Sequence, residues 1–238
     1  MRNDARRITA ELEGDFGDAL KGVLLFGSVA RGEAVDGVSN MNLLVLLDHV
    51  DTGVLQRARP HATRWRDAGT LPLLLEVGEW KQATDVFAIE LADMHDAHEV
   101  LHGDDPIRQH AIDRSAMRLQ AERELRSKLI HLRAGLLATA SDRAGVGSLL
   151  VAALPSFATY LRAALRLAGQ PVPAHMDQVL SAGARLVGAE PTGLLAAHAA
   201  RVAKKPLQLA LTDAVVETYH TAAERTAAYV DAFKESLG

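Results

Sequence analysis

A short stretch near the start of the chain contains a glycine-serine pair followed by two asparagines. Gly27 and Ser28 follow the apolar run 23–26, and Asn40 and Asn42 come at the start of a second apolar run. A Gly-Ser turn between a strand and a helix lets the backbone approach a phosphate closely, and serine adds a hydroxyl donor. Side chains at positions i and i+2 of a strand project from the same face. The pattern predicts a phosphate-binding turn beside a pair of polar side chains.

This pattern resembles the signature of the nucleotidyltransferase superfamily, the DNA polymerase beta-like and MNT-type enzymes. That signature combines a Gly-Ser pair, a nearby Arg-Gly, and Ser-Asp-x-Asp ahead of an apolar strand. In this chain Asn40 and Asn42 stand where the signature has its two aspartates. The other matching residues, which the resemblance implies lie at a nucleotide, are Gly27, Ser28, Arg31, Gly32 and Ser39.

The two asparagines change what the resemblance implies about chemistry. The family's aspartates hold magnesium ions, which neutralise a nucleoside triphosphate (NTP) during transfer. Magnesium at phosphates relies on carboxylates, and an amide oxygen brings no charge. We therefore expect Asn40 and Asn42 to bind magnesium weakly or not at all, in a catalytically impaired protein that still takes an NTP as ligand.

A third carboxylate stands on a later strand in the resembling family, as general base or as part of the metal site. Glu76, in the apolar run 73–77, is the best positional match, and Glu90 in the run 87–91 is the other candidate. Glutamate is unusual in a buried strand, so both residues are candidates for a functional role. A solvated strand end is the favoured interpretation of Glu76, and for Glu90 an ion pair or helix cap is at least as well supported as a functional role.

Other polar residues also have two interpretations. In the resembling family, Arg31 lies near the nucleotide or supports the loop, and the alternative is an ordinary surface arginine. The spacing of His95, His98 and His102 would place metal ligands on one helix face. No carboxylate or cysteine motif accompanies these histidines, which favours a solvated polar face.

Three functions remain open from the sequence. The first is an impaired nucleotidyltransferase-fold protein that binds a nucleotide or a protein partner through the Gly27-Ser28 turn, as a sensor, scaffold or regulator. The second is an active enzyme that moves a nucleoside monophosphate from an NTP to a small-molecule or protein hydroxyl, using Asp36, Asp48, Glu76 or Glu90. The third is a helical interaction module with a purely structural α/β half. The lost aspartates argue against the second and the retained signature against the third, so we expect the first. A homo-oligomer stays open.

Apolar spacing predicts an α/β arrangement over residues 1–105, the nucleotidyltransferase-like domain. Apolar residues four apart indicate a helix over 2–20 that ends at Gly22. The turn 103–106 predicts the domain boundary. Strands are expected at 23–26, 41–47 and 71–77, helices at 51–68 and 78–84, and an apolar stretch at 86–91 precedes the segment 94–103.

Long alanine- and leucine-rich patterns predict that residues 106–238 form an all-α helical bundle of four or five helices. Prolines at 171, 173 and 206 mark the clearest breaks. The expected fold class is α+β, a nucleotidyltransferase-like mixed sheet with helices followed by the bundle. The helical patterns cover 112–140, 146–169, 175–187, 191–204 and 207–235.

Composition excludes several classes of protein. The chain is 48% hydrophobic and 24% charged, which is typical of a soluble globular protein. A formal charge of −4 gives no general attraction to nucleic acid, so we expect no such partner. The lack of cysteine excludes disulfides and thiolate metal sites. No segment approaches the roughly 20 apolar residues that span a bilayer, so we expect no membrane association and a cytoplasmic location.

Overall fold

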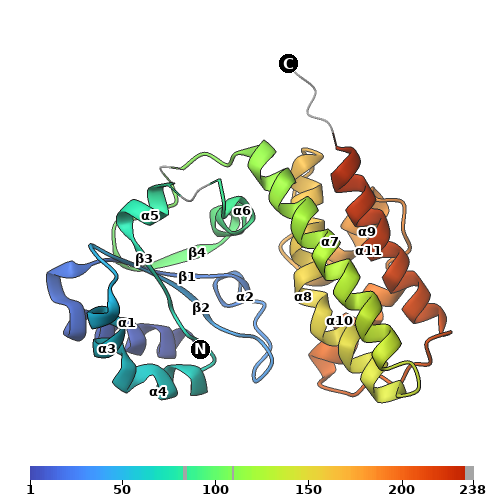
Figure 1. Ribbon diagram of the computed structural model, residues 1–238, viewed down its shortest axis with the longest axis horizontal. Helices are drawn as coiled ribbons and strands as arrows, with labels where there is room; N and C mark the ends of the chain where they lie inside the picture. Colours follow the sequence, from blue (N-terminus) through green and yellow to red (C-terminus); the bar gives the residue numbers. More distant parts are fainter. Residues whose placement is uncertain (83–84, 109, 234–238) are drawn as a thin grey trace. The chain divides into compact units, whose positions relative to one another are not determined.

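The computed structural model describes residues 1–82, 85–108 and 110–233 and divides the chain into two units, Met1–Asp113 and Arg114–Gly238 (Figure 1). The first unit holds the four-stranded sheet and the second is built of helices, which confirms the expected α+β class. The division falls after Asp113, beyond the predicted boundary at Asp105. Ile107, only 1% exposed, packs into the core of the first unit and fixes this segment there.

The first unit begins with helix α1 (Arg2–Phe16), whose buried face includes Ile8 and Leu12. The helix ends because Gly17 adopts a φ of 49°, which favours glycine. A short 3-10 turn, η1 (Gly17–Ala19), then leads into strand β1 (Leu20–Phe26). The predicted helix end at Gly22 was wrong, since Gly22 lies inside β1.

The sheet of the first unit is mixed, as predicted, with the strand order β3-β2-β1-β4. Strand β1 pairs antiparallel with β2 (Asn42–Leu47) and with β4 (His98–Gly103), and β2 pairs in parallel with β3 (Leu73–Glu76). The segment 94–103, left unassigned from the sequence, therefore contributes an edge strand. Its residues are half-buried or exposed, so the apolar signal of a central strand is missing.

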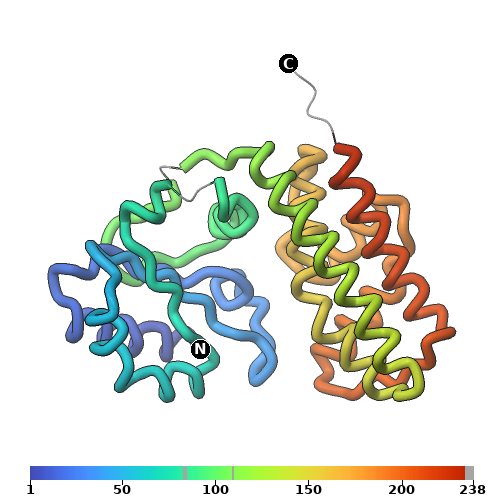
Figure 2. The backbone as a smooth tube through the Cα atoms, viewed as in Figure 1, coloured from blue at the N-terminus to red at the C-terminus, as the bar shows by residue number. Residues whose placement is uncertain are grey.

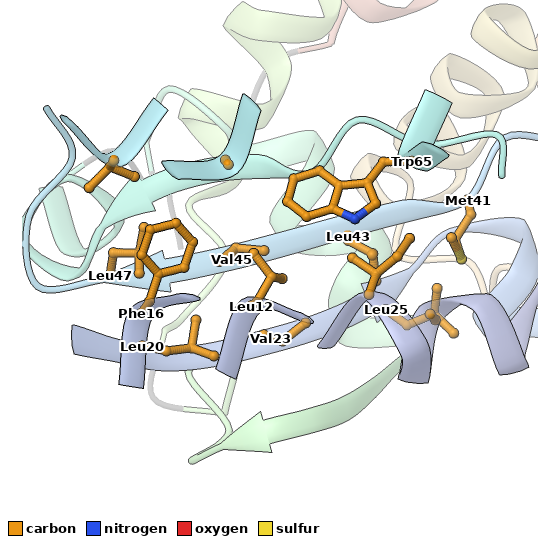
Figure 3. Packing of buried hydrophobic residues seen from close by; sticks show 14 of the residues in the cluster. Leu12, Phe16, Leu20, Val23, Leu25, Met41, Leu43, Val45, Leu47 and Trp65 are labelled. Carbon is orange, nitrogen blue, oxygen red and sulfur yellow. The ribbon is translucent and has the colours of Figure 1, made fainter. Parts of the chain in front are cut away.

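Two hydrophobic cores lie on opposite faces of this sheet (Figure 1). On the α1 face, helices α1, α3 (Thr52–Ala58) and α4 (Ala62–Asp67) cover the first core, drawn in Figure 3. On the α6 face, α5 (Val77–Gln82) and α6 (Ala88–Asp96) cover the second. Successive strand residues point to opposite faces, so β2 sends Leu43, Val45 and Leu47 into the first core and Leu44 and Leu46 into the second.

One predicted helix of the first unit is interrupted, and another is described only in part. The pattern over 51–68 is divided by a 3-10 turn, η2 (Arg59–His61), which contains Pro60. Proline lacks the amide donor that a continuous helix needs at this position. The helix expected over 78–84 is α5, and residues 83–84 lie outside the described residues.

The second unit contains five helices within its described residues, as the apolar patterns predicted, and Figure 2 follows their path. Helices α7, α8 and α11 lie side by side, and α9 and α10 pack against α8. Residues 234–235 of the last predicted helix lie outside the described residues. The helices are α7 (Arg114–Ala138), α8 (Arg143–Leu167), α9 (Met176–Leu186), α10 (Thr192–Ala203) and α11 (Ala214–Ala232).

Helix α8 is long and apolar enough to cross a membrane by length and composition alone, which the sequence analysis did not anticipate. Its buried residues include Val146, Leu150, Leu154, Phe157 and Leu161, which recur every three or four positions. That spacing builds one apolar stripe along the helix. The stripe is buried within the bundle, so α8 packs as a core helix of this unit.

Candidate functional site

The structure brings two residues of the signature into direct contact. Phe26, the last residue of β1, pairs with Asn42, the first residue of β2, so the turn after β1 lies beside the start of β2. A Cβ atom added to Gly27 would lie 2.6 Å from the Asn42 Nδ2 atom. The Asn42 amide is the end of an exposed, flexible side chain that can move aside, so the positive φ of Gly27 is the stronger reason for glycine at this position.

The turn itself also depends on glycine at both of its ends. Gly27 adopts φ 76° and ψ −150°, and Gly32 adopts φ 76° and ψ 17°. Between them α2 (Ser28–Arg31) forms one helical turn, closed by the Arg31 N–H, which donates to the Gly27 carbonyl at 3.0 Å. A single turn contributes little macrodipole, so any attraction for a phosphate would come mainly from its local amides. The half-buried Ser28 hydroxyl makes no hydrogen bond within the described residues.

The two asparagines lie on the side of the chain away from the first core. Asn40 and Asn42 are exposed, whereas the intervening Met41 is 1% exposed and packs in that core. Asn42 belongs to β2 and Asn40 precedes it. Because Asn42 alternates with Leu43, its side chain lies on the α6 face of the sheet. Neither asparagine side chain makes a hydrogen bond within the described residues.

Ser39 supports the loop that carries the asparagines. Its hydroxyl accepts a hydrogen bond from the Val35 N–H at 2.9 Å, and its own N–H donates to the Val35 carbonyl at 2.8 Å. These two bonds close the loop 35–39. The contacts of Ser39 therefore give it a local structural role, in addition to its match with the signature.

Arg31 is not an exposed surface arginine. Its side chain is only 12% exposed, and its Nε atom lies 3.3 Å from Glu33 Oε2, with that side chain 11% exposed. The Arg31 Nη1 atom is buried and has no hydrogen-bond partner within the described residues. A buried guanidinium with an unused donor lies in the turn between Gly27 and Gly32, which supports a role in the loop or at an anion.

Glu76 is not brought to the asparagines. It pairs with Leu47, whose side chain enters the first core, so Glu76 faces the α1 side of the sheet. Asn42 faces the other side and lies five residues back along β2, roughly 16 Å away along the strand. Glu76 Oε1 instead accepts a hydrogen bond from the Val50 N–H at 2.9 Å and lies 2.6 Å from His49 Nδ1. These contacts hold the connection after β2.

The other three candidate carboxylates, Asp36, Asp48 and Glu90, lie in different places relative to the asparagines. Asp48 follows the far end of β2 and pairs with Lys21 at 2.9 Å. Asp36 is exposed in the loop before the asparagines. Glu90 is half-buried on α6, the helix whose Leu91 packs over the Asn42 side of the sheet. Strand β2 itself brings no carboxylate to that side of the sheet.

The three histidines are distributed over two elements instead of one helix face. His95 on α6 contacts the His110 carbonyl at 2.7 Å, and His102 on β4 contacts Glu13 at 2.7 Å. His98 lies opposite Phe26 on β4 and has acceptors at both ring nitrogens, as described below. Among the described residues no group of three or more histidine and carboxylate side chains could hold a metal ion.

Sequence reasoning missed the role of Asp105, whose carboxylate lies 3.1 Å from His98 Nε2. His98 Nδ1 lies 2.7 Å from the Met94 carbonyl. Asp105 also accepts from the Ile107 N–H at 3.0 Å. Burial alone would raise the pKa of Asp105, but the hydrogen bonds from His98 and Ile107 outweigh it and lower that pKa below its ordinary value. The turn punctuation at 103–106 was the available signal, and it indicated only a boundary.

The donor set at Asn40 and Asn42 does not fit a magnesium ion. Both side chains offer neutral oxygens, whereas magnesium bound at phosphates is held by at least one carboxylate. Without that charge, the sheet gives little compensation for removing water from the ion. The arrangement can approach and hydrogen-bond an anionic ligand, but it lacks the charge to hold the metal that accompanies nucleotidyl transfer.

Comparison with known proteins identifies the fold. The sequence matches no known protein-family model and no curated protein sequence. Among solved structures, the chain is similar to spectinomycin adenyltransferase AAD(9) from Enterococcus faecialis, crystallised with ATP and spectinomycin, with a TM-score of 0.61. The two are 14% identical, over 95% of this chain and 99% of that one. At this identity the likeness shows the fold alone, which this chain shares with that adenyltransferase.

Proposed function

We propose that this nucleotidyltransferase-fold protein binds an NTP at the Gly27-Ser28 turn without needing magnesium, and that it is catalytically impaired. The observation that carries the proposal is the contact between Gly27 and Asn42. It places a neutral amide directly at the turn, where the resembling enzymes have a carboxylate. The similar solved structure contains ATP, which supports a nucleotide as the ligand class.

The described residues support binding more than turnover. Positive φ angles at Gly27 and Gly32 shape the turn, the Ser28 hydroxyl is unused, and Arg31 is buried with a free Nη1 donor. These features suit a phosphate, which is recognised by backbone amides, hydroxyls and guanidinium donors. Transfer of a nucleotidyl group also needs stabilisation of developing charge, which metal ions usually supply. Asn40 and Asn42 are poorly suited to hold those ions.

If a protein binds a nucleotide without transferring it, its function depends on a difference between the nucleotide-bound and the free protein. We therefore assign it a regulatory or sensing role in the cytoplasm, in which nucleotide binding stabilises the first unit by mass action. A protein partner would then distinguish the bound from the free form. Helix α8, the one described helix apolar enough for a membrane, is instead packed as a core helix.

Calorimetry with ATP tests whether the turn is the binding site. Wild-type protein should bind ATP in the presence of EDTA, and Ser28→Asp should weaken binding about tenfold or more by placing a carboxylate where the phosphates bind. Thr52→Asp adds the same charge to an exposed position at the start of α3, beyond the far end of β2, and should leave the affinity unchanged. Equal ATP affinity in Ser28→Asp and wild type would contradict the proposed site.

A further inference from the structure

Strand β3, which neighbours the strand of Asn42, carries a leucine on the same face of the sheet as the Asn42 side chain. Strand β3 runs parallel to β2 with Leu73 directly opposite Leu44. Directly paired residues on neighbouring strands project from the same face of a sheet. Leu44 lies on the α6 face with Asn42, because the two are at positions i and i+2 of β2 and only Leu43 lies between them. Leu73 therefore lies on the same face as Asn42, one strand over.

Leu73 also differs from the other residues of its strand in exposure. It is 55% exposed, although leucine is usually buried. Leu74 packs against the first core and Leu75 against the second. Neighbouring strands lie about 4.8 Å apart and two residues of a strand span about 6.6 Å, so Leu73 and Asn42 are diagonal neighbours about 8 Å apart, within reach of a long side chain. A glutamate in place of Leu73 would therefore reach the space beside Asn42.

Only one position of β3 meets the geometric demands on a third metal-site carboxylate. Such a residue must share the face of Asn42 and lie near the start of β2. Leu74 and Glu76 lie on the opposite face, and Leu75, opposite Leu46, is two residues farther along. Leu73 satisfies both demands, whereas Glu76 satisfies neither.

We infer that Leu73 occupies the third acidic position of the ancestral site, so that β2 and β3 have lost three carboxylates instead of two. This inference deepens the proposed function and depends on it for the meaning of the site. It explains why no carboxylate of β3 compensates for Asn40 and Asn42. It also means that returning two aspartates rebuilds an incomplete metal site.

Metal titration of restored variants tests the position of Leu73 without measuring turnover. Manganese is titrated by calorimetry into full-length Asn40→Asp/Asn42→Asp, and into the same protein carrying Leu73→Glu or Leu55→Glu. Leu55 is a matched control, because it is 53% exposed on α3, which covers the opposite face of the sheet. Both glutamates add the same charge at a similarly exposed leucine, and thermal unfolding of each variant checks that it is folded before the titration.

The variant with Leu73→Glu should bind manganese about tenfold more tightly than the variant with Leu55→Glu, as expected for one nearby carboxylate at a partly exposed site. Equal affinities in these two triple variants would overturn the assignment of Leu73. Manganese binding by the Asn40→Asp/Asn42→Asp variant, compared with wild type, tests the proposed function separately. If it binds manganese no better than wild type, the metal role assigned to positions 40 and 42 fails, whichever way the Leu73 comparison falls.

Discussion

The Asn42 side-chain Nδ2 atom lies 2.6 Å from the position that a Cβ atom on Gly27 would occupy. This relationship joins the end of β1 to the start of β2 at the one point where the signature's two halves meet. It brings the amide of residue 42 to the turn. Because that amide is the end of an exposed, flexible side chain, it can move aside when the turn changes.

The first prediction is that Gly27→Ala destabilises the protein by about 2 kcal/mol, from backbone strain at φ 76°. Because the exposed Asn42 amide can move aside, this cost should change by less than about 0.5 kcal/mol in an Asn42→Ala background. Urea unfolding of the four proteins in the cycle measures this coupling. A coupling of about 1 kcal/mol or more would show instead that the Asn42 side chain is held rigidly against the turn.

The second prediction concerns the buried ion pair of the turn. Arg31→Met should cost about 2 to 3 kcal/mol, because it leaves the 11% exposed Glu33 without this cation. Arg7→Met is the control, since Arg7 is 49% exposed and its pair with Asp4 at 3.0 Å lies on the helix surface. That exposed pair should contribute less than about 1 kcal/mol. Chemical unfolding that gives the same loss for both variants would contradict the buried role of Arg31.

The third prediction follows from the lowered pKa of Asp105. A carboxylate whose pKa is lower in the folded state stabilises the fold above its unfolded pKa, near 3.9, and loses that contribution as the pH falls through the folded value. Asp105→Asn should therefore cost about 2 kcal/mol at pH 7. The difference from wild type should shrink below about pH 4.

The control for this pH dependence is Asp104→Asn, at the neighbouring exposed residue. It should leave stability nearly unchanged at every pH. Thermal unfolding of the three proteins from pH 3 to pH 7, taken as a range around the ordinary carboxyl pKa, makes the comparison. A constant difference between wild type and Asp105→Asn across this range would show that the charge of Asp105 is not what stabilises the segment.

Much of the fold could be predicted because its signals are local. Apolar periodicity located β2 and the five helices of the second unit, since these elements bury regular faces. The end of α1 and the strand β4 were not predicted, because neither has a distinctive local sequence pattern. Gly17 ended α1 through a positive φ that its sequence neighbours did not reveal, and β4 is a half-buried edge strand without a strong apolar pattern.

The candidate site was only partly predictable. The spacing of Gly27, Ser28 and Arg31 identified the turn, because those residues are adjacent along the chain. The strand position of Glu76 matched in sequence order, but its face and distance depend on the register between β2 and β3. A shift of one residue moves a side chain to the opposite face. The contribution of Leu73 could therefore be inferred only from the sheet.

The most direct test of the central claim is the magnesium dependence of ATP binding. Calorimetry would compare wild type with Asn40→Asp/Asn42→Asp, each in EDTA and in magnesium. We predict that wild-type affinity is nearly the same in both conditions, and that the double variant gains affinity when magnesium is present. Wild-type ATP binding that strengthens sharply with magnesium would contradict the loss of the metal site and favour an active nucleotidyltransferase.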